Sequence, residues 1–143
     1  MAESFPEKPI ITTVAALITR QEGDEKQVLL TRRGYPPYKD QWCLPGGHIE
    51  NNVPAREAVI REVEEEVGLK FTAQFFAYFD EIIPTLHIHA VVLVFDGPAS
   101  GILRAQPGEV LEIKWFTFED AGKQPLAFQH NQILLAYQES KGK

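Results

Sequence analysis

Residues 42–69 of the chain read WCLPGGHIENNVPAREAVIREVEEEVGL, and this stretch decides the fold. Its second half predicts a helix over 53–67, because Pro54 suits a first helical turn and valines recur at a spacing of four residues up to Val67. Gly68 follows as a C-terminal stop. Upstream, Gly46 and Gly47 permit a tight backbone where side chains would clash. We therefore expect a tight turn followed closely by a helix.

Three carboxylates stand beside and partly within the apolar face of this predicted helix: Glu62, Glu65 and Glu66. Like charges three or four residues apart cost a few tenths of a kcal/mol per pair, and carboxylates in a last turn oppose the helix dipole by roughly 0.3–1 kcal/mol each. A bound divalent cation would reverse this penalty. Oxygen ligands select hard ions, so the pattern indicates Mg²⁺ or Mn²⁺, with a phosphate-bearing substrate completing the shell. The alternative is a solvated acidic patch.

The rest of the chain predicts strands on both sides of this helix and a second helix near the end. A polar turn at 21–25 separates two aliphatic runs and predicts a hairpin or two neighbouring strands. Gly, Pro and Tyr residues predict an ordered loop over 34–41. Strands are expected over 10–19, 28–31, 71–83, 87–95 and 112–118, and a helix over 131–140. This order predicts a layered α/β or α+β domain.

Composition limits the classes of protein to consider. The 143 residues carry a net charge of −6 and are 44% hydrophobic, which predicts one globular domain over 1–143. Cys43 is the only cysteine, so no internal disulfide can form, and no signal-type or membrane-spanning apolar segment is present. We expect a cytoplasmic protein without a membrane partner. An acidic chain without Lys/Arg clusters also argues against binding to duplex nucleic acid and favours small ligands.

The central stretch is similar to a known family signature. Residues 47–69 can be written Gly47-x5-Val53-x7-Arg61-Glu62-Val63-x-Glu65-Glu66-x-Gly68-Leu69. This pattern resembles the box of the Nudix hydrolases, and residues 42–50 resemble the usual lead-in to that box. The resemblance implies a Nudix α/β/α sandwich with a mixed sheet and Mg²⁺-dependent hydrolysis of a nucleoside diphosphate linked to another group. It also implies that Glu62, Glu65, Glu66 and the carbonyl of Gly46 bind the metal.

One position departs from the signature. Val53 stands where the family has a glutamate, which generally holds the box arginine. Arg61 therefore lacks its usual partner, and we expect reduced rather than abolished activity. Glu57 lies four residues before Arg61 in the favourable orientation for a replacement ion pair, which would be worth about 0.3–0.5 kcal/mol if exposed.

The sequence leaves several candidates for the general base that activates water. Glu65 or Glu66 could serve directly, whereas Glu109 lies in a stretch similar to the family's later glutamate-bearing loop. We favour Glu109 as an auxiliary ligand or base; otherwise it is an ordinary turn glutamate. Glu112, on the following predicted strand, is expected to be a charge on a strand face.

Arginines and aromatic residues are the candidates for substrate binding. Arg32 and Arg33 could bind phosphate oxygens, although surface ion pairs are an equal alternative. Tyr35, Tyr38 and Trp42 could stack on a base, although aromatic residues near a loop more often pack internally.

Two further features bear on the substrate. His87 and His89 alternate on one face of a predicted strand, and without cysteines they indicate packing or substrate contacts and not a zinc site. The segment from Arg32 to Gly47 and the Phe-Gln-His sequence at 128–130 resemble ADP-ribose-cleaving enzymes, whereas the short chain favours nucleoside triphosphates. The alternative to an active enzyme is a nucleotide-binding module without turnover. Because dimers are common among similar proteins, a homodimer is also possible.

Overall fold

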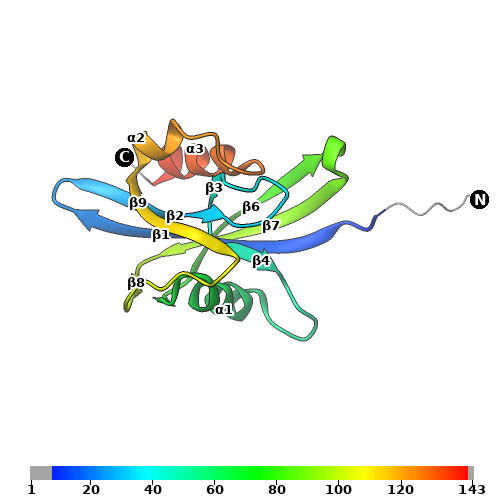
Figure 1. The fold of residues 1–143 in the computed structure, drawn as a ribbon, viewed down its shortest axis with the longest axis horizontal. Helices are drawn as coiled ribbons and strands as arrows, with labels where there is room; N and C mark the ends of the chain where they lie inside the picture. The colour runs from blue at the N-terminus through cyan, green and yellow to red at the C-terminus, as the bar shows by residue number, and fades with distance from the viewer. Residues whose placement is uncertain (1–7, 142–143) are drawn as a thin grey trace, which may run out of the picture.

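The computed structural model describes residues 8–141 and contains a seven-stranded mixed sheet with helices on both faces (Figure 1). The strand order is β3-β2-β1-β7-β6, with β4 also paired to β1 and β9 to β2, and β5 and β8 form a separate ribbon. The strands are β1 (Ile11–Glu22), β2 (Glu25–Arg33), β3 (Trp42–Cys43), β4 (Gly46–His48), β5 (Lys70–Phe71), β6 (Gln74–Ile83), β7 (Ile88–Gly97), β8 (Ala99–Ser100) and β9 (Val110–Thr117). The helices are α1 (Ala55–Val67), α2 (Phe118–Gly122) and α3 (His130–Ser140), with a 3₁₀ turn η1 (Pro84–Leu86). Figure 1 shows α1 below the sheet and α2 and α3 above it, so the expected sandwich is confirmed.

The central strand β1 divides the core into two layers. It runs antiparallel to β2 and parallel to β7, and successive side chains of a strand point to opposite faces. Val14, Ala16 and Ile18 pack with the buried side of α1, whereas Ala15 and Leu17 pack with residues of α2 and α3. Both faces of this strand are therefore buried, as its continuous run of aliphatic residues requires.

Helix α1 follows the predicted helix closely. It begins at Ala55 with Pro54 at the N-cap, and its buried face comprises Ala58 and the predicted valines. Gly68 ends it in the left-handed region at φ 78°, where its N–H donates to the Glu64 carbonyl. A residue without a Cβ adopts this conformation at little cost, which explains why the helix stops here.

Three other features of the structure differ in detail from what the sequence predicts. The strand expected over 71–83 is divided into β5 and β6, because the Thr72 N–H turns away to donate to the Pro98 carbonyl at 3.0 Å. Helix α2 was not predicted; it starts where the Thr117 side chain accepts a hydrogen bond from the Asp120 N–H. His87 has φ 55° after η1 and lies outside β7, so the interpretation that it shares a strand face with His89 is wrong.

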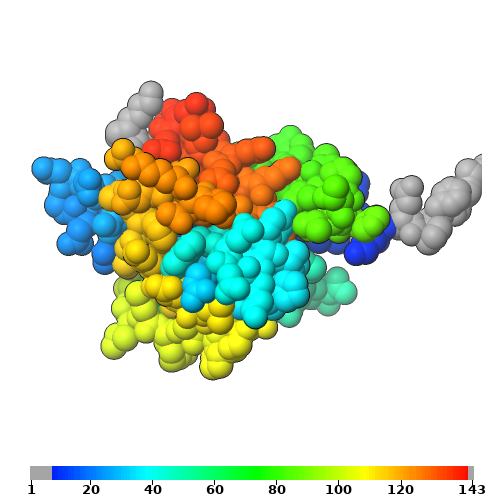
Figure 2. All heavy atoms as spheres, turned by 45° about the horizontal axis from the view of Figure 1, so that its top comes forward, coloured from blue at the N-terminus to red at the C-terminus, as the bar shows by residue number. Residues whose placement is uncertain are grey.

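Loop 34–41 contacts both the segment before β9 and the segment before α3. In Figure 2 this loop, in cyan, lies between the orange segment that leads to α3 and the yellow segment that precedes β9. The Gly34 N–H donates to the Glu109 carbonyl at 3.0 Å, and the Tyr38 ring packs 4.9 Å from that of Phe128. Within residues 8–141, no helix has the length and hydropathy needed to cross a membrane.

Candidate active site

The glycine turn at the start of β4 brings the backbone against two carboxylates of α1. Because β4 pairs with β1, a Cβ added at Gly46 would collide with the Val14 carbonyl. A Cβ at Gly47 would lie 2.8 Å from Oε1 of Glu62, so that carboxyl group occupies the space of the missing side chain. The Gly46 N–H donates a hydrogen bond to Glu66. The two glycines are therefore needed for this close approach.

Glu62 and Glu66 form a pair of carboxyl groups in hydrogen-bond contact. Burial, followed by the hydrogen bond and charge of Glu62, raises the pKa of Glu66 well above its ordinary value. Burial is also the main cause of the raised pKa of Glu62. Within residues 8–141, no Lys or Arg lies within ion-pair distance of either group. The pair is thus a concentration of negative charge that the described residues do not balance.

Glu65 does not join this pair in the structure. Its side chain is exposed, whereas Glu62 and Glu66 are half-buried. In the described part of the chain, no three His, Cys, Asp or Glu side chains are grouped closely enough to hold a metal ion. The donor set nevertheless fits a hard divalent cation, since it consists of adjacent carboxylate oxygens without a counter-ion beside a glycine backbone.

Glu109 is brought to this pair by the loop that precedes β9. The Gln106 N–H donates to the Glu66 carbonyl at 3.1 Å, which ties the loop to the last turn of α1. A small pocket of about 30 Å³ is lined by Glu66, Glu109, Gly46 and Arg33 among others. The structure therefore places Glu109 at one opening with Glu66, although the two residues are far apart in sequence.

Arg33 is the cation at this pocket. Its guanidinium lies 4.4 Å from the centre of the Tyr35 ring and 4.9 Å from that of Phe128, and its Nε donates to the Pro37 carbonyl at 2.8 Å. It makes no ion pair with any residue in 8–141. Stacking on aromatic rings leaves the edge of a guanidinium free for phosphate oxygens.

Comparison with known proteins identifies the family. A NUDIX domain profile matches residues 10–137. The chain belongs to the Nudix domain family. It is 34% identical over 119 residues to the ADP-ribose pyrophosphatase of Methanocaldococcus jannaschii, a match that covers 81% of this chain and 68% of the relative.

Two further similarities support this assignment. The chain is 32% identical over 127 residues to the NAD-capped RNA hydrolase NudC of Deinococcus radiodurans; this match covers 88% of the chain but only 44% of NudC. The chain therefore spans less than half the length of that relative. The crystal structure of a MutT NUDIX hydrolase from Burkholderia pseudomallei superposes with a TM-score of 0.80 at 30% identity, covering 90% of this chain and 98% of that one.

Arg32 lies in a different environment from Arg33. Its Nη1 is 3.0 Å from Asp40 and its Nε is 3.2 Å from Oε1 of Glu112, which faces it across the β2–β9 register. Arg32 of the Nudix domain is therefore engaged by two of the domain's own carboxylates. This arrangement agrees with the alternative that Arg32 forms surface ion pairs. Glu112 has the role of a strand-face charge.

The box arginine has a partner that the sequence reasoning missed. Nη1 of Arg61 lies 3.2 Å from Oε1 of Glu50, so the proposed replacement pair with Glu57 is wrong. The reason is the turn before α1, in which the Val53 N–H donates to the Glu50 carbonyl and the chain folds back along the helix.

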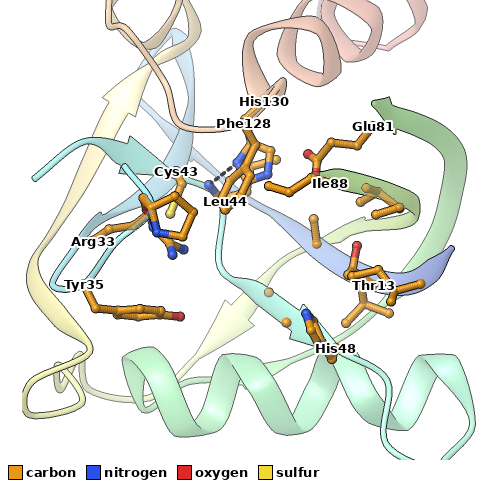
Figure 3. Close-up of a pocket in the computed structure, with 18 residues that line it drawn as sticks. Thr13, Arg33, Tyr35, Cys43, Leu44, His48, Glu81, Ile88, Phe128 and His130 are labelled. Carbon is orange, nitrogen blue, oxygen red and sulfur yellow. Dashed lines mark hydrogen bonds between the residues drawn. The ribbon is translucent and has the colours of Figure 1, made fainter. Parts of the chain in front are cut away.

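The predicted aromatic residues divide between packing and the site. Trp42 packs edge-to-face on Phe116 at 5.0 Å and contacts the core, as the packing alternative expected. Tyr38 packs on Phe128, whereas Tyr35 borders the cavity drawn in Figure 3.

That cavity is also lined by polar residues that the sequence did not indicate, among them Glu81 and His130. It measures about 300 Å³, and Glu81 and His130 line it (Figure 3). A signal for Glu81 exists in the alternation of β6, which places it on the same face as Ala77 and Phe79, where an apolar residue would be expected. His130 carries no such signal beyond its place in the Phe-Gln-His segment.

Proposed function

We propose that this Nudix domain is a metal-dependent pyrophosphohydrolase that cleaves a nucleoside diphosphate linked to another group. The observation that supports the proposal is the half-buried pair of Glu62 and Glu66, without an ion-pair partner in residues 8–141, beside a pocket lined by Glu66, Arg33 and Glu109. Buried charges of one sign are costly and are normally balanced, so a site that keeps them favours a removable cation.

The metal ligands we propose are Glu62, Glu65, Glu66 and the carbonyl of Gly46, for Mg²⁺ or Mn²⁺. Such an ion, when bound, neutralises phosphate oxygens and lowers the pKa of bound water. Glu65 is exposed and does not lie with the pair, so its part in this ligand set rests on its place in the box.

The protein's own residues supply the remaining steps. Arg33 binds a phosphate of the substrate and holds it in line with the attacking water. In the reaction, a bond forms between the water oxygen and phosphorus while the phosphoanhydride bond breaks. Glu109 accepts the proton of the water, and Glu66 is the alternative base.

For the substrate, we propose an ADP-ribose-type compound in preference to a nucleoside triphosphate. The archaeal relative is named as an ADP-ribose pyrophosphatase, and the Phe-Gln-His segment borders the 300 Å³ cavity at Phe128 and His130. The cavity offers room for a base beside the proposed phosphate position.

A panel of nucleotides incubated with Mg²⁺, with identification of the products, tests this proposal. We expect multiple turnovers, with products that contain a nucleoside monophosphate. If no phosphoanhydride is cleaved even at high enzyme concentration, the proposal is wrong.

The second candidate is a nucleotide-binding module without turnover, and Val53 at the glutamate position of the box favours it. Nucleotides would then raise the melting temperature without being consumed. Multiple turnovers would exclude this candidate.

A further inference from the structure

Non-glycine residues with positive φ angles are concentrated around Arg33. Within residues 8–141 the structure has five of them, and three lie in the two segments beside this arginine: Tyr38 at φ 64°, Asp40 at φ 74° and Phe128 at φ 56°. A bulky side chain rarely adopts this conformation. Such residues persist only where surrounding contacts hold them, and they cluster at functional sites. The positive φ angle of Phe128 therefore points to a role for the direction of its ring.

The ring of Phe128 lies against the Arg33 guanidinium. The Cζ atom of Arg33 is 4.9 Å from the centre of this ring and 4.4 Å from the centre of the Tyr35 ring. In Figure 3, the Arg33 side chain lies between Tyr35 and Phe128. The Arg33 Nε–H is used within loop 34–41, where it donates to the Pro37 carbonyl. No carboxylate of residues 8–141 engages the rest of the guanidinium, so an anion can bind it.

Contacts from three directions hold the Phe128 ring in place. The Tyr38 ring packs 4.9 Å from it, and the ring of His130, at the start of α3, packs 5.5 Å from it. The preceding residue is tied to β3, because the Ala127 N–H donates to the Trp42 carbonyl at 2.8 Å. The ring is therefore held from loop 34–41, from α3 and from β3.

We propose that Phe128 is a positioning residue, which holds the Arg33 guanidinium in the orientation that a substrate phosphate requires. An unrestrained arginine side chain has many rotamers, and it loses this freedom when it binds an anion. Contact with two rings and with the Pro37 carbonyl removes much of the freedom before the phosphate arrives. The cost of binding the phosphate falls accordingly.

This inference rests on the proposed function, because the orientation of Arg33 matters only if Arg33 binds a phosphate. Phe128 lines the 300 Å³ cavity but not the small pocket of Glu66 and Glu109, whereas Arg33 lines both. Phe128 therefore acts on the phosphates through Arg33 and not by direct contact.

The first measurement needs neither substrate nor turnover. The Arg33 Nε–H is hydrogen-bonded and covered by two rings, so its exchange with water, followed by NMR in the metal-free protein, should be slow. Phe128→Leu should speed this exchange at least about fivefold, whereas Phe128→Tyr, which keeps a ring, should stay within about twofold of wild type. The Nε–H of Arg32, which donates to Glu112, is the internal reference and should not change.

A matched variant controls for the loss of a phenylalanine. Phe79→Leu makes the same change at a partly buried position of β6 and should leave the exchange of Arg33 unchanged. If Phe128→Leu does not fold, Phe128→Met replaces it with the same expectations, because methionine adapts to irregular packing. Thermal melts identify the folded variants.

The second measurement is a double-mutant cycle on ADP-ribose hydrolysis with Mg²⁺. With arginine at position 33, Phe128→Leu should lower kcat/KM about fivefold, mainly through a higher KM, and Phe128→Tyr should restore most of the loss. In the Arg33→Lys background, Phe128→Leu should change kcat/KM less than about twofold, because lysine lacks the planar group that the rings orient.

Two results would overturn the inference. One is the same Arg33 exchange rate in wild type and Phe128→Leu. The other is an equal loss of kcat/KM in the arginine and lysine backgrounds, which would mean that the ring contacts the substrate or only supports the fold. The proposed function fails separately, if the wild type cleaves no phosphoanhydride; faster exchange in Phe128→Leu would still support the positioning of Arg33.

Discussion

Two carboxylate sites of the molecule, buried Asp96 at the end of β7 and the half-buried pair Glu62 and Glu66 at the end of α1, have different partners. At the end of the sheet near α3, Oδ2 of Asp96 accepts a hydrogen bond from the Tyr137 hydroxyl at 3.2 Å and lies 3.6 Å from Nζ of Lys141. Nζ of Lys26 in turn donates to the same hydroxyl at 3.1 Å. At the end of α1, Glu62 and Glu66 have each other, and no Lys or Arg of residues 8–141 forms an ion pair with either of them.

The difference distinguishes a structural charge from a binding site. At Asp96, one cation and one hydroxyl engage Oδ2, and only Oδ1 lacks a hydrogen-bond partner among the described residues, so the fold itself supplies most of the compensation for this charge. A half-buried pair of like charges lowers the stability of the metal-free protein, and either a proton on Glu66 or an external cation reduces this penalty. The same kind of side chain thus contributes to the fold at one site and to ligand binding at the other.

The largest effect is expected on catalysis. Glu66→Gln should lower turnover at least tenfold, which corresponds to about 1.4 kcal/mol of barrier, and leave the fold intact. Steady-state hydrolysis of the best substrate with Mg²⁺ measures it. Glu64→Gln, which makes the same charge change on an exposed position of α1, is the control and should stay within about twofold of wild type. Equal rates for Glu66→Gln and Glu64→Gln would contradict the assignment of the Glu62–Glu66 pair as a functional site.

The next effect concerns the structural carboxylate. Tyr137→Phe deletes the hydroxyl that links Lys26 to Asp96, and should lower the free energy of unfolding by about 1–3 kcal/mol because a buried charge loses a donor. Urea denaturation with and without Mg²⁺ measures the change. The loss should be the same in both conditions; a loss that Mg²⁺ restores would show that the two sites are not independent.

A smaller effect is expected on the stability of the metal-free protein. Because the pKa of Glu66 is raised in the fold, the folded state keeps a proton that the unfolded chain releases near the ordinary value of 4.5. Stability in EDTA should therefore fall as pH rises through the folded-state pKa, and Glu66→Gln should reduce this fall. Thermal melts across pH measure it.

The effect of Mg²⁺ on thermal stability tests the same pair of carboxylates in the presence of metal. At neutral pH, Mg²⁺ should raise the melting temperature of the wild type more than that of Glu66→Gln. An identical rise in both proteins would contradict the assignment of the pair as ligands.

The smallest effect is expected at the departure from the family signature. Val53→Glu should preserve or modestly raise activity, because Arg61 already has Glu50 as a partner, and an exposed pair contributes only about 0–1 kcal/mol. The measurement is kcat/KM with Mg²⁺. A clear loss of activity would mean that the turn before α1 requires Val53. The roles of the family's box residues could then not be assigned to the matching positions of this chain.

Predictions from the sequence were most successful where neighbours along the chain decide the structure. The valine spacing and Gly68 predicted α1 to within its first two residues, and the apolar runs located the longer strands β1, β2, β6, β7 and β9, but not the short strands β3, β4 and β8. Helix α2 was missed because five residues carry too little periodicity. Spacing within the helix predicted Glu57 as the partner of Arg61. The actual partner, Glu50, lies before α1 and is brought to Arg61 by a turn that helical spacing does not describe.

By itself, the sequence determined the family signature, the acidic helix and a layered domain, since these depend on the spacing and order of residues along the chain. Only the tertiary structure decided which of these charges meet. Leu44 and His130 lie 86 residues apart, yet one hydrogen bond between them sets the tautomer of the ring. Glu109 lines the same pocket as Glu66 because its loop is hydrogen-bonded to the last turn of α1 through Gln106. Contacts of this kind depend on how whole elements pack, and no local pattern of residues encodes them.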